Sequence, residues 1–377
     1  MSASINRRDW LKTNSLAALT LGFSLPSMAN EEGLLRNFGR EQGLINLGSN
    51  ENPYGISPKA KEAILEMINE AHRYQFNVAS LQNFEKTIAD YYKISGSQVL
   101  ATAGSGDALG KLARHFTKGS LVTATPTFAT LPNTAKKLGT KVIEVPLTAQ
   151  KTHDLPAMLK AIDGNTQMVY ICNPANPSST IVSSMKLVDF CIEAAKKAVV
   201  IVDEAYIDFL DAPDNLSMIG LIDKNPNVMV VRTFSKIHAM AGLRVGFVAG
   251  HASLIKELND NHFSNSKMNI SNLAAAAALA SLKDESHTTY CKQQNAIARD
   301  YTFRSLKEMK IDCIPSYTNF LFFPLGNYPG DFSKDMLAKN VILRSGTYPD
   351  GKWARVSVGT MDEMKQFISL MRADWKL

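Results

Sequence analysis

The stretch Val199-Val200-Ile201-Val202-Asp203-Glu204-Ala205-Tyr206 joins four consecutive β-branched residues to a segment that carries two carboxylates and a phenol. A short apolar run of this kind is typical of a strand buried on both faces, as in the parallel sheets of α/β proteins. In open sheets of this class, ligands bind beyond the carboxyl ends of the strands. The stretch therefore predicts an α/β fold and a site that begins at Asp203.

Similar apolar runs lie on both sides of this stretch and predict the rest of the sheet. Between them are segments with helical periodicity, such as 183–197, where apolar residues recur every three or four positions. The predicted strands are Ser120–Ala124, Lys141–Val145, Met168–Cys172, Val199–Asp203, Val228–Thr233 and Val245–Ala249. This alternation predicts a mostly parallel sheet with helices on both faces.

The pattern changes from about Ala296 onward. A helix, strands near 319–323, 341–344 and 354–358, and a closing helix from Asp362 predict a smaller α+β domain. A chain of 377 residues is long enough for two domains. We place the large domain at residues 61–289 and the small domain at 290–377, with 30–60 as an arm that joins the small domain.

Two more strands end in polar segments at the same predicted edge of the sheet. They lead into Asn173-Pro174-Ala175-Asn176-Pro177 and into Arg232-Thr233-Phe234-Ser235-Lys236. These groups suit a pyridine aldehyde cofactor, because a lysine condenses with the aldehyde as a Schiff base and a carboxylate keeps the ring nitrogen protonated. We expect Lys236, Asp203 and Tyr206 to be catalytic, and Asn176 and Tyr206 to hydrogen-bond the ring hydroxylate. Each residue alone is better explained by a cap or a turn, so the prediction rests on their joint occurrence.

The phosphate of such a cofactor needs a binding site of its own. Ala103-Gly104-Ser105-Gly106-Asp107 precedes the apolar helical segment 108–116, and backbone amides at a helix start bind anions. The segment fails as a dinucleotide fingerprint, because Leu109 stands where the third glycine belongs. The predicted cofactor contacts are Ser105, Gly106, Thr233, Ser235, Arg244 and Phe128, the last of which either stacks on the pyridine or belongs to the core.

The composition narrows the possible partners. Hydrophobic residues make up 45% and charged residues 20% of the chain, as in globular proteins. The net charge of +6 is not gathered into a basic stripe, so we expect no nucleic-acid partner. The four cysteines are too widely spaced for a metal site, which favours free buried thiols and leaves one disulfide as an alternative.

The first residues carry a separate pattern. Asn6-Arg7-Arg8-Asp9-Trp10-Leu11-Lys12 precedes an apolar run from Ser15 to Leu25, and Ser27-Met28-Ala29 supplies small residues for cleavage. The pattern resembles a twin-arginine export signal over residues 1–29, and the alternative is an ordinary amphipathic helix. The run is too short to span a bilayer, so we expect no stable membrane anchor. The expected location is the periplasm, or the cytoplasm if the signal is not used.

From about Asn46 almost to the C-terminus, the ordered motifs resemble the fold-type I aminotransferases that use pyridoxal 5′-phosphate, and most closely the histidinol-phosphate aminotransferase branch. The resemblance implies that Lys236 carries the cofactor and that Arg355 binds the substrate carboxylate. It also implies a homodimer with shared active sites, because Tyr74 matches a tyrosine that reaches the phosphate across a subunit interface. The motifs are residues 47–55 (LGSNENPYG), Asn176-Pro177, Asp203-Glu204-Ala205-Tyr206, the segment from Ser235-Lys236 to Leu243-Arg244, and residues 355–360 (RVSVGT).

Two positions depart from the family pattern. Ser179 stands where the family usually has the glycine of a Thr-Gly pair, which puts the conformation of that loop in question. Gly106-Asp107 stands where the branch tends to have Asp-Glu, so a backbone contact replaces a side-chain contact. Neither change removes a group that the chemistry requires.

The expected activity is ping-pong transfer of an amino group between an amino acid, or a histidinol phosphate-like amine, and a 2-oxo acid. Asn176 and Arg355 are expected to contact the substrate, and Arg344 is either a second anion-binding residue or a surface salt-bridge partner. Histidine biosynthesis is intracellular, so the export signal favours an amino acid. The alternatives are a decarboxylase or lyase of the same fold, similar to phosphothreonine decarboxylases, and a non-catalytic ligand-binding protein.

Overall fold

The computed structural model describes residues 43–74, 78–263 and 269–375. The predicted export signal therefore lies outside the described residues. Residues 46–377 form one compact unit, and the short strand β1 (Ile45–Asn46) lies at its boundary. Among the described residues, no helix combines the length and the apolar character needed to cross a membrane.

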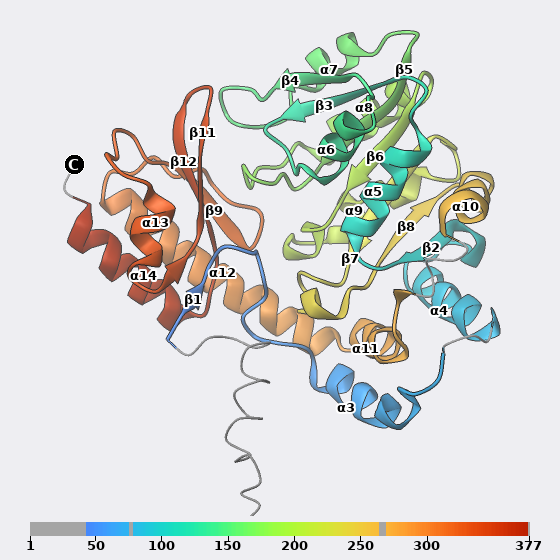
Figure 1. Ribbon diagram of the computed structural model, residues 1–377, viewed down its shortest axis with the longest axis horizontal. Helices are drawn as coiled ribbons and strands as arrows, with labels where there is room; N and C mark the ends of the chain where they lie inside the picture. The colour runs from blue at the N-terminus through green and yellow to red at the C-terminus, as the bar shows by residue number, and fades with distance from the viewer. Residues whose placement is uncertain (1–42, 75–77, 264–268, 376–377) are drawn as a thin grey trace, which may run out of the picture. The chain divides into compact units, whose positions relative to one another are not determined.

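A seven-stranded sheet organises the first part of this unit (Figure 1). Neighbouring strands pair in parallel from β4 through β3, β5 and β6 to β7, whereas β8 is antiparallel to both β7 and β2. The predicted mostly parallel α/β sheet is thus confirmed. In spatial order the strands are β2 (Val99–Thr102), β8 (Gly246–Gly250), β7 (Val228–Thr233), β6 (Val199–Asp203), β5 (Thr166–Cys172), β3 (Ser120–Thr125) and β4 (Val142–Pro146).

Two apolar clusters cover the two faces of this sheet. Along β6, Val200 and Val202 point into one cluster and Ile201 into the other, as alternation along a strand requires. The first cluster is completed by α3 (Pro58–Met67), α4 (Val78–Tyr91), α7 (Leu155–Ala161), α8 (Ser184–Ala195) and α11 (Asn272–Leu282). The second is completed by α5 (Ser105–His115), α6 (Thr130–Lys137) and α10 (Ala252–Leu258). Both faces are buried, which is why the central strands are apolar throughout.

A three-stranded antiparallel sheet organises the C-terminal part, with β12 between β11 and β9. The long helix α12 packs against α14 and against β9. The elements are α12 (Glu285–Glu308), β9 (Phe320–Pro324), α13 (Phe332–Leu337), β10 (Val341–Ile342), β11 (Arg344–Tyr348), β12 (Gly351–Ser357) and α14 (Met361–Asp374). The short remaining helices are η1 (Ile68–Glu70), η2 (Gly96–Gln98), η3 (Ile207–Phe209), α9 (Pro213–Leu216), η4 (Met218–Leu221), η5 (Ala241–Leu243) and the π-helix η6 (Asn259–Phe263).

The structure differs from the predicted elements in three places. The strand predicted at 341–344 is divided, because β10 ends at Ile342 and β11 starts at Arg344. Strand β11 is mostly exposed and polar, so its sequence lacks the apolar alternation from which a strand is predicted. Strand β2 was not predicted, since it has only four residues. Helix α12 begins at Glu285 rather than near Ala296, because its polar first turns carry no clear apolar stripe.

Candidate active site

The carboxyl ends of β5, β6 and β7 meet at one edge of the large sheet. The register places Cys172 opposite Asp203, and β7 continues past Thr233 into the loop that carries Lys236. A cavity of about 260 Å³ lies at this edge. The residues that line it are Ser49, Glu51, Ser105, Gly106, Phe128, Cys172, Asn176, Asp203, Ala205, Tyr206, Ser235, Lys236, Ala241 and Arg244.

Asp203 lines this cavity with a buried carboxyl group. Its Oδ2 accepts a hydrogen bond from the Tyr170 hydroxyl at 2.9 Å, and its Oδ1 accepts one from the Ala205 amide at 3.1 Å. Burial raises the pKa of Asp203 to about 6, and the bond from Tyr170 opposes that shift. A cation beside the carboxyl group would lower its pKa again and favour its ionised form. The site is therefore suited to bind a cation.

Tyr206 and Asn176 are linked on one side of the cavity. The Tyr206 hydroxyl accepts hydrogen bonds from the side-chain amides of Asn50 at 3.0 Å and Asn176 at 3.2 Å. Burial raises the pKa of Tyr206, so the phenol stays protonated and has a proton to donate. This hydroxyl accepts two hydrogen bonds and keeps its proton, so it can donate a hydrogen bond to an anionic oxygen in the cavity.

Lys236 enters the cavity from the loop after β7. Its Nζ donates to the carbonyl oxygens of Asn50 at 3.1 Å and Ser49 at 3.3 Å, and it lies 5.7 Å from the centre of the Tyr206 ring. Burial lowers the pKa of Lys236 to about 8, and the positive charge of Arg355 adds to this effect. A lysine with a lowered pKa has a larger fraction of neutral amine near neutral pH, as a nucleophile requires.

Helix α5 begins at another side of the cavity, and Arg244 lies beside its first turn. Gly104, the N-cap residue, has φ 86°, and a Cβ there would lie 2.5 Å from Arg244 Nη2. A side chain at this position would therefore displace the guanidinium. Arg244 itself donates to the carbonyl of Ala241 at 2.8 Å. Free amides at the start of α5, together with a guanidinium, make a site for a dianion.

The hydroxyl groups of Thr233 and Ser235 stand next to this anion site. Thr233 Oγ1 donates to Ser235 Oγ at 2.9 Å and accepts from the Ser235 amide at 3.1 Å. Ser235 lines the cavity, whereas Thr233 does not and reaches it only through Ser235. Phe128 both lines the cavity and packs against the apolar cluster of α5 and α6, so it belongs to the core and to the site together.

Arg355 and Arg344 are direct neighbours on paired strands of the small sheet. Arg355 donates from Nη1 to Asn176 Oδ1 and from Nη2 to the carbonyl of Gly48, both at 2.8 Å, and burial lowers its pKa. Its buried Nε has no hydrogen-bond partner in the part of the chain that the structure describes. Arg344 is more exposed and donates to the same Gly48 carbonyl at 3.4 Å. Neither arginine pairs with a carboxylate among the described residues.

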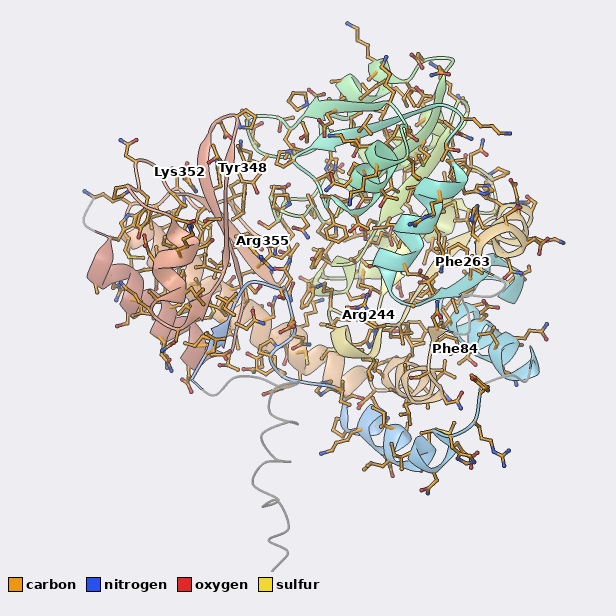
Figure 2. The ribbon with its side chains drawn as sticks, in the orientation of Figure 1. Phe84, Arg244, Phe263, Tyr348, Lys352 and Arg355 are labelled. Atoms are coloured by element: carbon orange, nitrogen blue, oxygen red, sulfur yellow. The ribbon has the colours of Figure 1, made fainter. Side chains whose placement is uncertain are left out.

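Figure 2 labels Arg355 and Arg244, which come from different parts of the unit.

Tyr74, a predicted cofactor contact, does not line the cavity. Its side chain is 87% exposed, on the segment that follows α3 and η1. The structure contains a single chain, so a site completed by a second copy would leave Tyr74 at the surface.

Several residues in or next to the cavity had no predicted role. Ser49, Asn50 and Glu51 belong to the motif at 47–55, and their carbonyls or side chains contact Lys236, Tyr206 or the cavity. The motif itself was the available signal. Tyr170 gave no signal, because a tyrosine inside an apolar strand is expected to be a core residue.

A buried ion pair lies beneath this edge of the sheet. Arg232 Nε donates to Glu204 Oε2 at 2.9 Å, and its other nitrogens contact Asp208 and Ser217 at 3.1 Å. Glu204 also accepts from the amide of Met218 at 2.6 Å. Because Glu204 follows Asp203 and Arg232 stands on β7, the pair ties together the two strand ends that carry Asp203 and Lys236.

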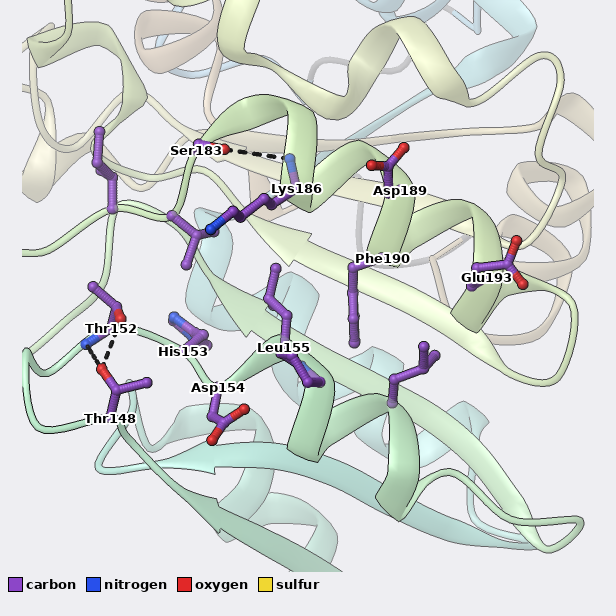
Figure 3. A pocket seen from close by; sticks show the side chains of 14 residues that line it. Thr148, Thr152, His153, Asp154, Leu155, Ser183, Lys186, Asp189, Phe190 and Glu193 are labelled. Carbon is purple, nitrogen blue, oxygen red and sulfur yellow. Dashed lines mark hydrogen bonds between the residues drawn. The ribbon is translucent and has the colours of Figure 1, made fainter.

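A larger cavity of about 730 Å³ lies between α7 and α8 (Figure 3). His153 there is buried, its Nε2 has no partner among the described residues, and burial lowers its pKa to about 4. Asp154 and Ser183 cap the two helices by accepting from the amides of Ala157 and Lys186. No predicted site residue lines this cavity, and the convergent reactive groups all lie at the strand ends.

Comparison with known proteins decides the family. Residues 42–370 match the family described as "Aminotransferase class I and II", and this match covers most of the chain and every residue of the cavity. The chain belongs to the class I and II aminotransferases. It is an enzyme that moves amino groups with pyridoxal 5′-phosphate, as the sequence predicted.

Relatives of this aminotransferase bear a more specific name. A histidinol-phosphate aminotransferase of Bacillus cytotoxicus is 34% identical over 346 residues, which are 91% of each chain. One from Bacillus subtilis is 31% identical over 345 residues, which are 90% of this chain and 94% of the relative. The solved histidinol-phosphate aminotransferase of Sinorhizobium meliloti, in complex with pyridoxal-5′-phosphate, has a TM-score of 0.82 at 22% identity and covers 95% of this chain and 99% of that one. The last similarity concerns the fold.

The residues of this aminotransferase fit the cofactor. A dianion site at the start of α5, a carboxyl group at Asp203 and an amine at Lys236 surround one small cavity, and the bare Gly104 lets Arg244 approach the helix start. Asp203 would stand beside the ring nitrogen, Tyr206 and Asn176 beside the ring hydroxylate, and Ser105, Gly106, Ser235 and Arg244 around the phosphate. When bound, the cofactor supplies an electron-poor ring that stabilises negative charge on the substrate α-carbon.

The two departures from the family pattern leave the site of this aminotransferase in place. Ser179 adopts φ 61°, the left-handed conformation that a glycine would take, and its amide donates to Ala175 at 2.9 Å. The loop that presents Asn176 is therefore retained, at the energetic cost of a strained serine. Asp107 does not line the cavity, since it pairs with Lys111 at 2.7 Å.

Proposed function

We propose that this aminotransferase transfers the amino group of an amino acid to a 2-oxo acid in a ping-pong cycle. The observation that carries the proposal is the single cavity in which Lys236, Asp203 and Tyr206 lie together, with Arg355 bonded to Asn176 at its margin. In it, the Lys236 amine would take the proton from the substrate α-carbon and deliver it to the C4′ carbon of the cofactor, as a base with a pKa near 8 is suited to do. The Asp203 carboxylate would keep the ring nitrogen of the cofactor protonated. The Tyr206 hydroxyl would orient the cofactor ring by a hydrogen bond.

Arg355 is proposed to bind the substrate carboxylate. The support is a partly buried guanidinium whose buried Nε is unpaired and whose pKa is lowered; a carboxylate would accept a hydrogen bond from Nε and stabilise the charged form. Arg344, its neighbour across the strands, would bind a second anionic group of a substrate. The relatives named above are called histidinol-phosphate aminotransferases, and that substrate carries a phosphate in place of the carboxylate. We favour an amino acid here because of the export-like N-terminus.

A donor panel tests this proposal. The protein, loaded with cofactor, is assayed with common amino acids and with histidinol phosphate, each with 2-oxoglutarate as acceptor. We expect Arg355→Gln to raise KM for the best amino acid by about 10²- to 10³-fold, because a buried charged hydrogen-bond partner is lost. Arg344→Gln should raise KM only for donors or acceptors with a second acidic group.

The matched control is Arg372→Gln, which removes an exposed guanidinium paired with Glu308 and should change nothing. Turnover of histidinol phosphate far above that of every amino acid would contradict the choice of substrate. Release of carbon dioxide without an acceptor would point instead to the decarboxylase alternative.

We also propose a homodimer in which each copy contributes Tyr74 to the partner's cofactor phosphate. The exposed Tyr74 and the exposed apolar side chains of Leu65 and Ile68 on the same segment support a surface that a second copy covers. The test mixes two inactive variants, Lys236→Ala and Tyr74→Ala, after dissociation. A hybrid dimer has one intact site, so random pairing should restore about a quarter of the wild-type activity. No recovery from dimers shown to be hybrid would contradict a shared site.

Export is proposed from the sequence of residues 1–29 alone. The support is the paired Arg7 and Arg8 before a short apolar run. The full chain should be recovered from the periplasm of a bacterial host, and an Arg7→Lys, Arg8→Lys double variant should stay in the cytoplasm. An unchanged distribution of the double variant would contradict a twin-arginine signal.

A further inference from the structure

Tyr170 lies inside β5 and reaches the cavity only through Asp203. Its side chain is fully buried and packs in the apolar cluster that also holds Ile201, Met229 and Val231. A phenol in such surroundings needs a partner for its hydroxyl group. That partner is Asp203 Oδ2 at 2.9 Å.

The register of the sheet explains how this contact arises. Tyr170 is opposite Ile201 and Cys172 is opposite Asp203, so Tyr170 stands two residues below Asp203 on the same face of the sheet. Two residues along a strand span about 6.6 Å, a distance that a tyrosine ring with its hydroxyl group bridges and shorter polar side chains do not. The Tyr170 hydroxyl thus contacts the Asp203 carboxyl group from the side away from the cavity. The side of the carboxyl group that faces the cavity remains accessible.

The donors to Asp203 are few. Among the described residues, its hydrogen bonds come from the Tyr170 hydroxyl and the Ala205 amide, one to each oxygen, and no lysine or arginine forms an ion pair with it. The titratable groups around it are Tyr170 and Cys172 from β5, Glu204 and Tyr206 after β6, and Lys236 after β7. Of these groups, Glu204 raises the pKa of Asp203, while Tyr170 and, more weakly, Lys236 lower it.

We propose that Tyr170 is a positioning residue that holds the Asp203 carboxylate ionised and turned toward the cavity. The inference rests on the role of Asp203 beside the cofactor ring. An ionised, fixed carboxylate attracts a protonated ring nitrogen, whereas a carboxyl group with one donor fewer is more often neutral and free to rotate. Tyr170 therefore acts on the cofactor without touching it.

The test is a double-mutant cycle on the full-length apo-protein, with the dissociation constant of pyridoxal 5′-phosphate as the main readout. Tyr170→Phe should weaken cofactor binding by about 10- to 100-fold, since a hydrogen bond to a charged group is lost. It should also raise the pH below which binding fails, because losing a donor raises the pKa of Asp203. In an Asp203→Asn background, the same substitution should change binding by less than about twofold.

Three results separate the possible failures. Equal losses from Tyr170→Phe in both backgrounds would mean that Tyr170 only supports the fold, and the inference would be wrong. Wild-type binding and turnover in Asp203→Asn alone would overturn the role of Asp203 and the inference with it. If Asp203→Asn weakens binding and Tyr170→Phe does not, only the role of Tyr170 fails.

Two further variants keep the test interpretable. Tyr92→Phe is the matched control, because this phenol packs against Phe247 and Arg232 and makes no contact with Asp203; cofactor binding should not change. If Tyr170→Phe does not fold, 3-fluorotyrosine at position 170 replaces it. The more acidic hydroxyl is a stronger donor, so the pH below which binding fails should fall, and a rise or no change would contradict the inference.

Discussion

Replacing Lys236 with alanine is expected to lower amino transfer by at least about 10⁴-fold, because one substitution removes both the nucleophile and the base. Among the described residues, Lys236 is the only lysine that lines the cavity, and burial lowers its pKa to about 8. Borohydride reduction of the cofactor-loaded wild type, followed by peptide mapping, should find the label on Lys236. The Lys236→Ala protein should carry no covalent label and should lose the absorbance that depends on it.

A control shows that the loss is specific. Lys256→Ala removes an exposed amine of α10 that is paired with Asp260, and its activity should stay within about twofold of the wild type. A label on another lysine in fully loaded wild-type protein would overturn the assignment of Lys236, and with it the reading of the cavity.

Asp203→Asn is expected to lower kcat by about 10²- to 10³-fold, because a neutral amide no longer stabilises positive charge on the ring nitrogen while negative charge develops on the substrate. The amide has nearly the shape of the carboxyl group, so the fold should be preserved. The effect should lie mainly in kcat of the amino-acid half-reaction, which stopped-flow absorbance measures directly. Cofactor affinity should fall as well.

The matched control for this prediction is Asp189→Asn on α8. That carboxylate lines the larger cavity between α7 and α8, where no predicted site residue lies, and its loss should leave kcat unchanged. A wild-type kcat in Asp203→Asn would mean that another group protonates the ring.

Much of the fold was predictable because burial on both faces leaves a direct trace in sequence. Strands β6 and β7 have the predicted bounds, since runs such as 199–202 are apolar at every position. Strand β11 was not predicted, because its residues are mostly exposed, do not pack in a core and show no apolar alternation. The antiparallel direction of β8 also required the structure, since an apolar run does not state the direction in which it pairs.

The site divides in the same way. Asp203 ends a predicted strand, and Asn176 and Lys236 each follow one, so their convergence could be inferred from the rule that ligands bind at carboxyl ends of strands. The neighbours of these groups could not be inferred. The bond from Asn50 to Tyr206 joins residues 156 positions apart, and the bond from Arg355 to Asn176 joins residues 179 apart.

The sequence by itself determined the α/β class and the aminotransferase family, and it predicted which residues carry the chemistry, because apolar periodicity and short motifs are local properties of the chain. Only the tertiary structure decided the electrostatic state of those residues. The pKa values of Lys236 and Asp203 depend on burial and on partners such as Arg355 and Tyr170, which come from other strands. Burial and the distances between charges are set by packing, which brings together residues whose separation in the sequence does not predict that they meet.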